Sequence, residues 1–173
     1  MERINSRITH EGKMVSVRID EIRYEDGSTS EREVVAHPGA VAVVAHDDRH
    51  LVMVRQPREA VGEEALLELP AGKLDVEGES PLECAKRELL EETGVEASEW
   101  RELKRIYTSP GFSDERVHVF IAGGLRRVDP EPDEGERIEV IEIPLDELDE
   151  TIEQCSDAKS LVGLLLFREL RRG

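Results

Sequence analysis

The sequence of 173 residues predicts an α+β or mixed α/β fold on the basis of three observations. Short segments with the apolar patterns of strands, bounded by turn signals, recur through the first 70 residues and again after residue 100. Three segments carry the apolar spacing and the end signals of helices. The length fits one domain, since soluble domains usually have about 100–200 residues. Strands therefore dominate the predicted fold, and helices interrupt them.

The strands are expected in a hairpin, a buried pair and several shorter segments. Residues 14–24 alternate in polarity, and the Asp26-Gly27 turn returns the chain as a second strand. The continuous apolar run at 40–45 is typical of a strand buried on both faces, and its partner follows a turn at 47–49. The full set of predicted strands is 14–24, 28–36, 40–45, 51–55, 66–69, 103–107, 117–122 and 137–143.

The first predicted helix, at residues 81–93, has sequence signals at both ends. Ser80 is the expected N-cap, Pro81 stands at the first helical position and Glu83 at the third. This pattern is a capping box combined with the favoured position of proline. Gly94 is the expected stop, because glycine readily adopts the left-handed conformation that commonly ends a helix.

Two further helices are expected near the C-terminus. A short one covers residues 145–154. The other covers residues 158–170, with Asp157 as its N-cap. Arg171 and Arg172 follow it, where the negative end of the helix dipole favours cations. No internal repeat or low-complexity linker interrupts this order.

The composition is that of a soluble, acidic globular protein. Acidic residues outnumber basic ones, 40 to 23, which gives a formal net charge of −17. This charge argues against nucleic-acid binding, which needs basic surface to displace counterions. No apolar run approaches the roughly 18–20 residues of a membrane span, and the first ten residues lack the apolar core of a signal peptide. With the isolated cysteines Cys84 and Cys155, these features predict a cytoplasmic protein with reduced thiols.

The helix at 81–93 carries an acidic arc beside its apolar stripe. Glu88 and Glu92 lie one turn apart, and Glu91 and Glu92 occupy the last turn, which faces the negative end of the helix dipole. Like charges one turn apart cost about 0.2–0.5 kcal/mol per pair, and carboxylates in the last turn cost roughly 0.3–1 kcal/mol each. Two interpretations remain open: an exposed acidic face in an acidic protein, or carboxylates that converge on a hard cation such as Mg²⁺ or Mn²⁺.

The segment at residues 69–95 resembles the Nudix box, a family motif that runs from a glycine through a spaced glutamate to Arg-Glu-hydrophobic-x-Glu-Glu-x-Gly-hydrophobic. Residues 87–95 match the second half at every specified position, and Glu79 precedes the arginine by eight residues, as in the family. The match departs in one place, because six residues instead of the usual five separate Gly72 from Glu79. We expect the extra residue to form a bulge in the loop at 75–78, with the helix in register.

The resemblance implies a Nudix α/β/α sandwich with a mixed sheet, and a hydrolase that cleaves a nucleoside diphosphate linked to another group. It implies Mg²⁺ as the cofactor, with Mn²⁺ able to substitute. Carried onto this sequence, it makes Glu88 and Glu92 the principal metal ligands, assisted by the Ala71 carbonyl. Glu91 becomes a further ligand or a neighbour that orients the ligands.

The resemblance also assigns a role to Arg87. This residue would hold Glu91 or Glu79 in place through paired hydrogen bonds, a task for which lysine is a poor substitute. The chemistry of the cation agrees with these assignments. Mg²⁺ neutralises a pyrophosphate, lowers the pKa of a bound water and stabilises the leaving phosphate.

A second motif, at residues 109–115, follows one predicted strand and precedes another. Pro110 lies sixteen residues after the last glycine of the box, and a proline there resembles the ADP-ribose pyrophosphatase branch of the Nudix family. A Pro-Gly turn alone would explain this proline, but it would not explain Glu115. Because this branch delivers a catalytic carboxylate from the loop, we expect Glu115 to be the general base on the attacking water. Pro110 is assigned to substrate binding, and the aromatic residues that could stack on the base are Phe112, Tyr24 and Tyr107.

A third motif, at residues 54–59, resembles the strand end that this branch places near its nucleotide. Arg58 is expected to contact a phosphate or to stack on adenine, and Arg55 is a weaker candidate for the same task. The alternative for either arginine is a solvated surface cation. Glu68 is expected to hydrogen-bond a ribose hydroxyl, or else to have a structural role.

These motifs together predict Mg²⁺-dependent hydrolysis of ADP-ribose to AMP and ribose 5-phosphate. Two alternatives remain. One is a Nudix hydrolase for another substrate, such as an NDP-sugar, GDP-mannose or NADH. The other is a nucleotide-binding Nudix-fold regulator without turnover. The intact acidic motif argues against this regulator, because a site without turnover has no reason to keep carboxylates that repel each other.

The resemblance also implies a division of the chain. Residues 1–37 would form a small antiparallel sheet, and residues 38–173 would form the Nudix hydrolase domain. In the resembling branch, such N-terminal strands exchange between subunits. We therefore expect a homodimer, with a small nucleoside diphosphate as the substrate and with neither nucleic acid nor membrane as a partner.

Overall fold

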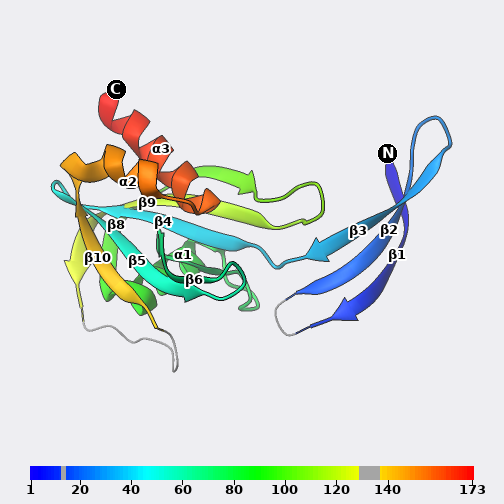
Figure 1. Ribbon diagram of the computed structural model, residues 1–173, viewed down its shortest axis with the longest axis horizontal. Coiled ribbons are helices and arrows are strands. Elements are labelled where there is room, and N and C mark those ends of the chain that lie inside the picture. Colours follow the sequence, from blue (N-terminus) through cyan, green and yellow to red (C-terminus); the bar gives the residue numbers. More distant parts are fainter. Residues whose placement is uncertain (13–14, 129–136) are drawn as a thin grey trace. The chain divides into compact units, whose positions relative to one another are not determined.

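The computed structural model of the chain separates into two compact units. Figure 1 shows the strands and helices of both. The structure describes residues 1–12, 15–128 and 137–173. The first unit comprises Met1–Gly39 and Tyr107–Arg116, and the second comprises Ala40–Ile106 and Val117–Gly173.

The first unit contains a three-stranded antiparallel sheet in the order β1-β2-β3. Its strands are β1 (Glu2–Glu11), β2 (Ser16–Arg23) and β3 (Thr29–Ala36). The β2–β3 turn forms because the Asp26 carboxylate accepts hydrogen bonds from the amide and hydroxyl of Ser28, while Gly27 adopts a φ of 82°. The predicted hairpin and the predicted small antiparallel sheet are therefore present. Met14, the first residue of the strand predicted at 14–24, lies outside the described residues.

Strand β1 is not predicted by the sequence. Nearly all of its residues are exposed, so no alternation of apolar and polar side chains marks it as a strand. Its partner β2 contributes Asp20, a charged residue that is only 5% exposed. The Asp20 carboxylate accepts hydrogen bonds from the Ser6 hydroxyl at 2.6 Å and from Arg18 at 3.0 Å. The buried charge in the small sheet is therefore paired.

The second unit is built on a seven-stranded mixed sheet. Its main order is β10-β5-β4-β9-β8, with β6 paired to β5 and β7 paired to β4. Strands β4 and β9 are parallel, whereas β5 is antiparallel to β4, β6 and β10. The strands are β4 (Ala40–His46), β5 (His50–Arg58), β6 (Glu63–Glu68), β7 (Ala71–Lys73), β8 (Val95–Tyr107), β9 (Arg116–Arg127) and β10 (Glu139–Pro144). The predicted mixed sheet is confirmed.

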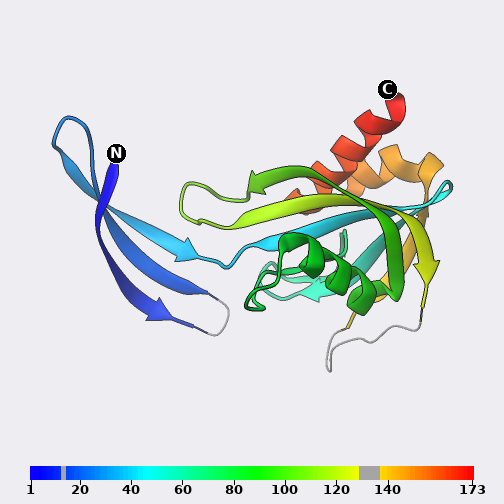
Figure 2. The ribbon, with the colours of Figure 1, turned by 180° about the vertical axis from the view of Figure 1, so that it is seen from behind.

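Helices cover both faces of this sheet, as Figures 1 and 2 show. Helix α1 (Pro81–Thr93) packs on one face, and α2 (Leu148–Gln154) and α3 (Ala158–Arg172) pack on the other. The central strand β4 alternates between the two cores: Ala42 and Val44 face α3, while Val43 and Ala45 face α1. This double burial explains why its sequence is a continuous apolar run. The predicted α/β/α sandwich is confirmed.

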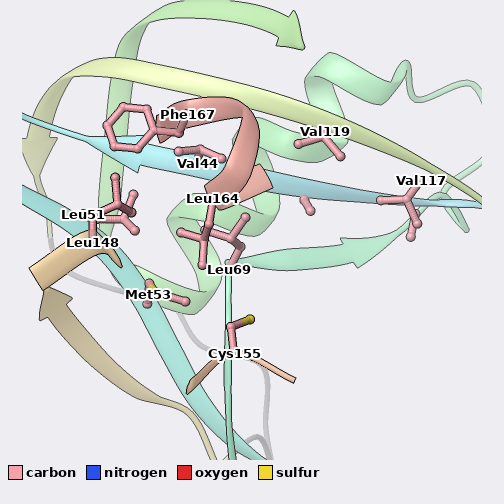
Figure 3. Close-up of a cluster of buried hydrophobic side chains, with 12 residues drawn as sticks. Val44, Leu51, Met53, Leu69, Val117, Val119, Leu148, Cys155, Leu164 and Phe167 are labelled. Carbon is pink, nitrogen blue, oxygen red and sulfur yellow. The ribbon is translucent and has the colours of Figure 1, made fainter. Parts of the chain in front are cut away.

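Figure 3 shows the core beneath α3, where Leu164 and Phe167 pack with Val44 and Leu69. Full burial of a side chain such as Leu164 contributes about 1.5–3 kcal/mol. A Cβ atom on Gly163 would lie 2.5 Å from the Leu69 Cδ1 atom and 3.0 Å from the Val44 Cγ2 atom. Helix α3 approaches the sheet this closely because residue 163 has no side chain.

Several predicted boundaries differ from the observed ones. The strand predicted at 103–107 is only the end of β8, whose earlier residues do not alternate regularly between buried and exposed positions. The three-residue strand β7 is too short to carry a pattern and is not predicted. The helix predicted at 145–154 begins as a 3₁₀ turn, η1 (Leu145–Glu147), before α2 continues it. Across the described ranges, no helix combines the length and the apolar character needed to cross a bilayer.

Candidate active site

The acidic motif lies on α1, whose two ends have the predicted caps. The Ser80 hydroxyl accepts a hydrogen bond from the Glu83 amide at 3.3 Å, and the Glu83 carboxylate accepts one from the Ser80 amide at 2.8 Å. At the other end Gly94 has a φ of 65°, and its amide donates to the Leu90 carbonyl at 2.8 Å. These caps define the start and the end of the helix, and Glu92 is one of its buried residues.

Gly72 provides the space that the Glu88 carboxyl group occupies. A Cβ atom at residue 72 would lie 1.8 Å from the Glu88 Cδ atom and 2.0 Å from its Oε1 atom. Non-bonded atoms do not approach so closely, so a side chain at residue 72 would displace the Glu88 carboxyl group. The close contact places Glu88 directly against the backbone of β7.

Glu92 contacts the same short strand. Its side chain is 8% exposed, and its Oε2 atom accepts a hydrogen bond from the Ala71 amide at 3.0 Å. The structure therefore brings Glu88 and Glu92 together at the Ala71–Gly72 segment. Sequence spacing alone could not distinguish this arrangement from an exposed acidic face.

The residues at β7 fit a divalent cation by their chemistry. Two carboxylates and a main-chain carbonyl supply the hard oxygen ligands that Mg²⁺ and Mn²⁺ prefer. The space at Gly72 also explains how a carboxylate can reach the main chain there. Within the described residues, no three acidic, histidine or cysteine side chains form a group that could hold a metal ion by themselves. The candidate site at β7 differs from such a group, because it has two carboxylates, and the Ala71 carbonyl is only expected to complete it.

Arg87 links the acidic residues of the motif. Its Nε and Nη2 atoms donate to the two carboxylate oxygens of Glu79 at 2.9 and 3.1 Å. Its Nη1 atom lies 2.8 Å from Glu91 Oε2 and 2.9 Å from Glu88 Oε1. The hydrogen bonds from Arg87 lower the pKa of Glu79, and the same contacts raise the pKa of Arg87. One guanidinium thus keeps three neighbouring carboxylates in place.

The thiol of Cys84 lies beside this cluster but has a structural role. The residue is fully buried, and its Sγ atom donates to the Lys73 carbonyl at 3.3 Å. Burial, followed by the negative charge of Glu88, raises the pKa of the thiol to about 12. Cys84 therefore stays protonated, and like Cys155 it is a free thiol.

A second charged cluster surrounds Glu68, at the end of β6. The carboxylate is only 3% exposed, and Arg58 donates to both of its oxygens, with Nη2 at 2.5 Å from Oε2. Gln56 and Lys159 also contact it, at 3.2 and 3.4 Å. Because these partners surround Glu68, its carboxylate has little access to a ligand. Its contacts are those of a structural residue.

Arg58 itself remains accessible. Its side chain is 40% exposed, so part of the guanidinium can meet a ligand while Glu68 holds the rest. The hydrogen bonds to Glu68 raise the pKa of Arg58, and the negative charge of Glu92 adds to the effect. The charge of Arg58 therefore interacts with the negative charge of the acidic motif. Arg55 is exposed and lies 4.0 Å from Glu139 of the neighbouring strand β10.

The loop residues of the second motif belong to the first unit. The Glu115 carboxylate accepts a hydrogen bond from the Thr108 hydroxyl at 2.5 Å, and its Oε1 atom lies 3.5 Å from His37 Nδ1. Pro110 lies in a turn, and the Phe112 ring is 59% exposed. The roles of Glu115, Pro110 and Phe112 toward a substrate stay predictions.

Sequence reasoning missed one residue beside the site. The hydroxyl of Ser160, in the first turn of α3, accepts a hydrogen bond from the Leu69 amide at 2.8 Å. Leu69 and Ser160 are 91 positions apart, so no local spacing connects them. The one local signal was Asp157, which was correctly predicted as the N-cap of α3. Its carboxylate accepts a hydrogen bond from the Ser160 amide at 3.0 Å.

Comparison with known families identifies the family of this chain. The family model described as NUDIX domain matches residues 35–162, which include β4, the β6–β7 segment and α1. The chain belongs to the Nudix family. The family predicted from the box is confirmed by this match.

Three curated relatives align with most of the chain. A "Methanol dehydrogenase activator" of Bacillus methanolicus is 40% identical over 88% of this chain and 84% of its own length. An "ADP-ribose pyrophosphatase" of Bacillus subtilis is 42% identical over the same shares. An "ADP-ribose pyrophosphatase" of Mycobacterium tuberculosis is 50% identical over 73% of this chain and 61% of its own length.

A solved structure has the same fold over nearly the whole length. It is described as "Crystal structure of ADP compounds hydrolase", with a TM-score of 0.86 and 26% identity. The alignment covers 99% of this chain and 94% of that one. The predicted enzyme class, a Nudix pyrophosphatase, is confirmed, and enzymes of this family use divalent metal ions.

Proposed function

We propose that this Nudix enzyme hydrolyses ADP-ribose to AMP and ribose 5-phosphate with Mg²⁺ as the cofactor. The observation that carries the reaction is the convergence of Glu88 and Glu92 on the Ala71–Gly72 segment. The choice of substrate is supported by the two ADP-ribose pyrophosphatases that are 42% and 50% identical. Water adds across the bond between one phosphorus and the bridging oxygen, so each product keeps one phosphate.

The oxygen atoms at β7 would hold the cation. These are the carboxylates of Glu88 and Glu92 and the carbonyl of Ala71. When bound, Mg²⁺ would neutralise charge on the pyrophosphate and lower the pKa of a water. Glu92 needs little reorientation for this task, because the Ala71 amide already holds its carboxylate. Arg87 would keep Glu79 and Glu91 in place while the cation binds.

Residues outside the box would bind and orient the substrate. Arg58 is proposed to contact a phosphate, because its guanidinium is held by Glu68 and yet partly exposed. Glu115 is proposed as the general base that takes a proton from the attacking water. Its loop also exposes the Phe112 ring, which would stack on the adenine base.

Product analysis tests this function. The protein is incubated with ADP-ribose, ADP-glucose, NADH and diadenosine polyphosphate, each with Mg²⁺ and with excess EDTA. Phosphorus NMR and mass spectrometry then identify the products. We expect ADP-ribose to be cleaved fastest, to equal amounts of AMP and ribose 5-phosphate, and only with Mg²⁺. Faster cleavage of another compound would contradict the substrate assignment, and equal rates in EDTA would contradict the metal.

A second candidate function is the regulation of another enzyme. It is favoured by one observation, the 40% identity to a protein named as an activator of a dehydrogenase. This candidate predicts that the protein binds nucleotides but turns over none of the tested compounds. The same panel, with binding measured by calorimetry, separates it from the proposed hydrolase.

We also propose that the protein is a cytoplasmic homodimer in which residues 1–37 exchange between subunits. The proposal is supported by the separate small sheet β1-β2-β3, which has few buried apolar side chains of its own. Size-exclusion chromatography with light scattering measures the mass. A dimer is expected at micromolar concentration, and a monomer there would contradict the exchange.

A further inference from the structure

The segment Leu69–Pro70–Ala71 connects β6 to β7 and carries the groups on which the proposed site depends. The Ala71 amide orients Glu92, and the Ala71 carbonyl is a proposed metal ligand. Pro70 has no amide hydrogen, and its carbonyl accepts from the Val43 amide at 2.9 Å. The amide of Leu69 points to the opposite side of the sheet from α1 and donates to α3. Both main-chain contacts restrict the position of Ala71.

The contact with α3 is buried and directional. Ser160 is 0% exposed, and its hydroxyl accepts from Leu69 while it donates to Asp157 Oδ2 at 2.5 Å. The same Oδ2 atom accepts from the Ser160 amide at 3.0 Å as the N-cap of the helix. Asp157 therefore orients the hydroxyl so that its lone pair faces the Leu69 amide.

The residue before Ser160 makes a parallel contact. Lys159 Nζ lies 2.9 Å from Asp157 Oδ2 and 3.4 Å from Glu68 Oε1. Glu68 and Leu69 are consecutive, so the first turn of α3 contacts the chain on both sides of their shared peptide bond. Gly163, one turn further along, allows this approach because any Cβ atom would collide with Leu69.

We propose that the first turn of α3 positions the metal-binding segment, and that Ser160 is a positioning residue for Ala71 and Glu92. The inference rests on the proposed function for the identity of the site. The segment Leu69–Pro70–Ala71 connects Ser160 on the α3 side of the sheet with Glu92 on the α1 side. Loss of the Ser160 hydroxyl leaves the Leu69 amide without its partner, so the segment loosens and the ligands at β7 are less well preorganised.

The test compares Ser160→Ala with two matched variants. Ser160→Thr restores a hydroxyl at the same atom and should rescue the effect. Thr151→Val removes a different buried hydroxyl, which donates to the Glu147 carbonyl at 2.9 Å within η1 and α2, and serves as the control for general stability. Calorimetry measures Mn²⁺ affinity without substrate, and amide hydrogen exchange is followed at Leu69 and Ala71.

We expect Ser160→Ala to weaken Mn²⁺ binding about 5–10-fold, the range of one lost hydrogen bond, with KM for ADP-ribose unchanged at saturating metal. Exchange at Leu69 and Ala71 should accelerate by a similar factor in Ser160→Ala and stay at the wild-type rate in Thr151→Val. Equal metal affinity in Ser160→Ala and wild type would overturn the proposal, as would an equal loss in Thr151→Val.

The two proposals can fail separately. If the wild-type protein binds no divalent cation, the proposed function fails, and hydrogen exchange alone then decides whether Ser160 positions the segment. Unchanged exchange at Leu69 and Ala71 in Ser160→Ala overturns the positioning role whatever the metal does.

Discussion

Among the described residues of the second unit, the charged cluster around Arg87 on α1 and the one around Arg58 beside β6 differ in how their charges are matched. In the α1 cluster, Arg87 contacts the three carboxylates of Glu79, Glu88 and Glu91. In the β6 cluster, Arg58 and Lys159 face Glu68, and Lys159 also faces Asp157. Carboxylates exceed cations among the contacts of Arg87, whereas the contacts of the β6 cluster are balanced.

The difference in charge distinguishes a cluster suited to metal binding from a cluster that supports it. Carboxylates that lie close together repel each other, and a cation that binds beside them relieves this repulsion. A buried carboxylate with two cations and an amide has its charge and hydrogen bonds already satisfied. We therefore assign metal binding to the side of the α1 cluster that faces β7, and a supporting role to the β6 cluster, with Arg58 as its accessible end.

The greatest loss of activity is expected from removing one proposed metal ligand. Glu92→Gln should lower kcat by about 10²–10⁴-fold, because a metal supplies several kcal/mol of transition-state stabilisation. The fold should survive, since the amide oxygen can still accept from Ala71. Steady-state hydrolysis of ADP-ribose measures the effect. Glu153→Gln, an exposed carboxylate on α2, is the control and should behave as wild type. Near-normal turnover by Glu92→Gln would remove the distinction between the two clusters.

Filling the space at Gly72 tests the same region without changing a charge. Gly72→Ala places a methyl group where the Glu88 carboxyl group lies, so metal affinity should fall about 10–100-fold. Gly123→Ala is the matched control, because its nearest neighbour would lie at an ordinary 3.4 Å. Calorimetric titration with Mn²⁺ measures both. Retained affinity in Gly72→Ala would show that Glu88 does not bind the ion.

Replacing each of the two arginines by lysine tests whether the two clusters have different roles. Lysine cannot reproduce the paired hydrogen bonds of either arginine. Arg87→Lys should therefore lower metal-free stability by about 1–3 kcal/mol, or roughly 2–10 °C in Tm, and should also weaken metal binding. Arg58→Lys should lower Tm to a similar degree while metal affinity stays within about twofold of wild type. Differential scanning calorimetry with and without Mg²⁺ distinguishes them, and an equal metal effect in both would contradict the separation of roles.

The smallest effect is in the acid range. Burial alone would raise the pKa of Asp157, but the charge of Lys159 and the hydrogen bonds from Ser160 and Lys159 lower it below 3.8 overall. A lowered folded-state pKa means that this carboxylate stabilises the fold above pH 3.8 and loses that contribution as the pH falls further. Asp157→Asn should therefore have a lower Tm than wild type at pH 7, and the difference should shrink as the pH falls below 3.8. A constant difference in Tm at all pH values would contradict this assignment.

The local parts of the fold and site are predictable from the sequence. Ser80, Glu83 and Gly94 define α1 through contacts within one or two turns, so a short motif contains all the information. The buried run of β4 is equally plain, because a strand covered on both faces needs apolar residues at every position.

Long-range contacts were not predictable in this way. The hydrogen bond from Leu69 to Ser160 and the ion pair between Lys159 and Glu68 join segments about ninety positions apart. Glu68 is an example. Its neighbours in the sequence allowed either a ribose contact or a structural role, and its burial among Arg58, Gln56 and Lys159 favours the structural role. Strand β1 escaped prediction for another reason, since its exposed side chains have no apolar pattern.

The proposed divalent cation would bind between α1 and β7, and its position can be measured directly. Paramagnetic Mn²⁺, added in small amounts to isotope-labelled protein, broadens the NMR signals of nearby amides. We predict that the amide signals of Ala71, Gly72, Glu88 and Glu92 disappear first in the wild-type protein and persist in Glu92→Gln. First broadening around the exposed acidic residues of α2, or the same broadening in both proteins, would contradict the account.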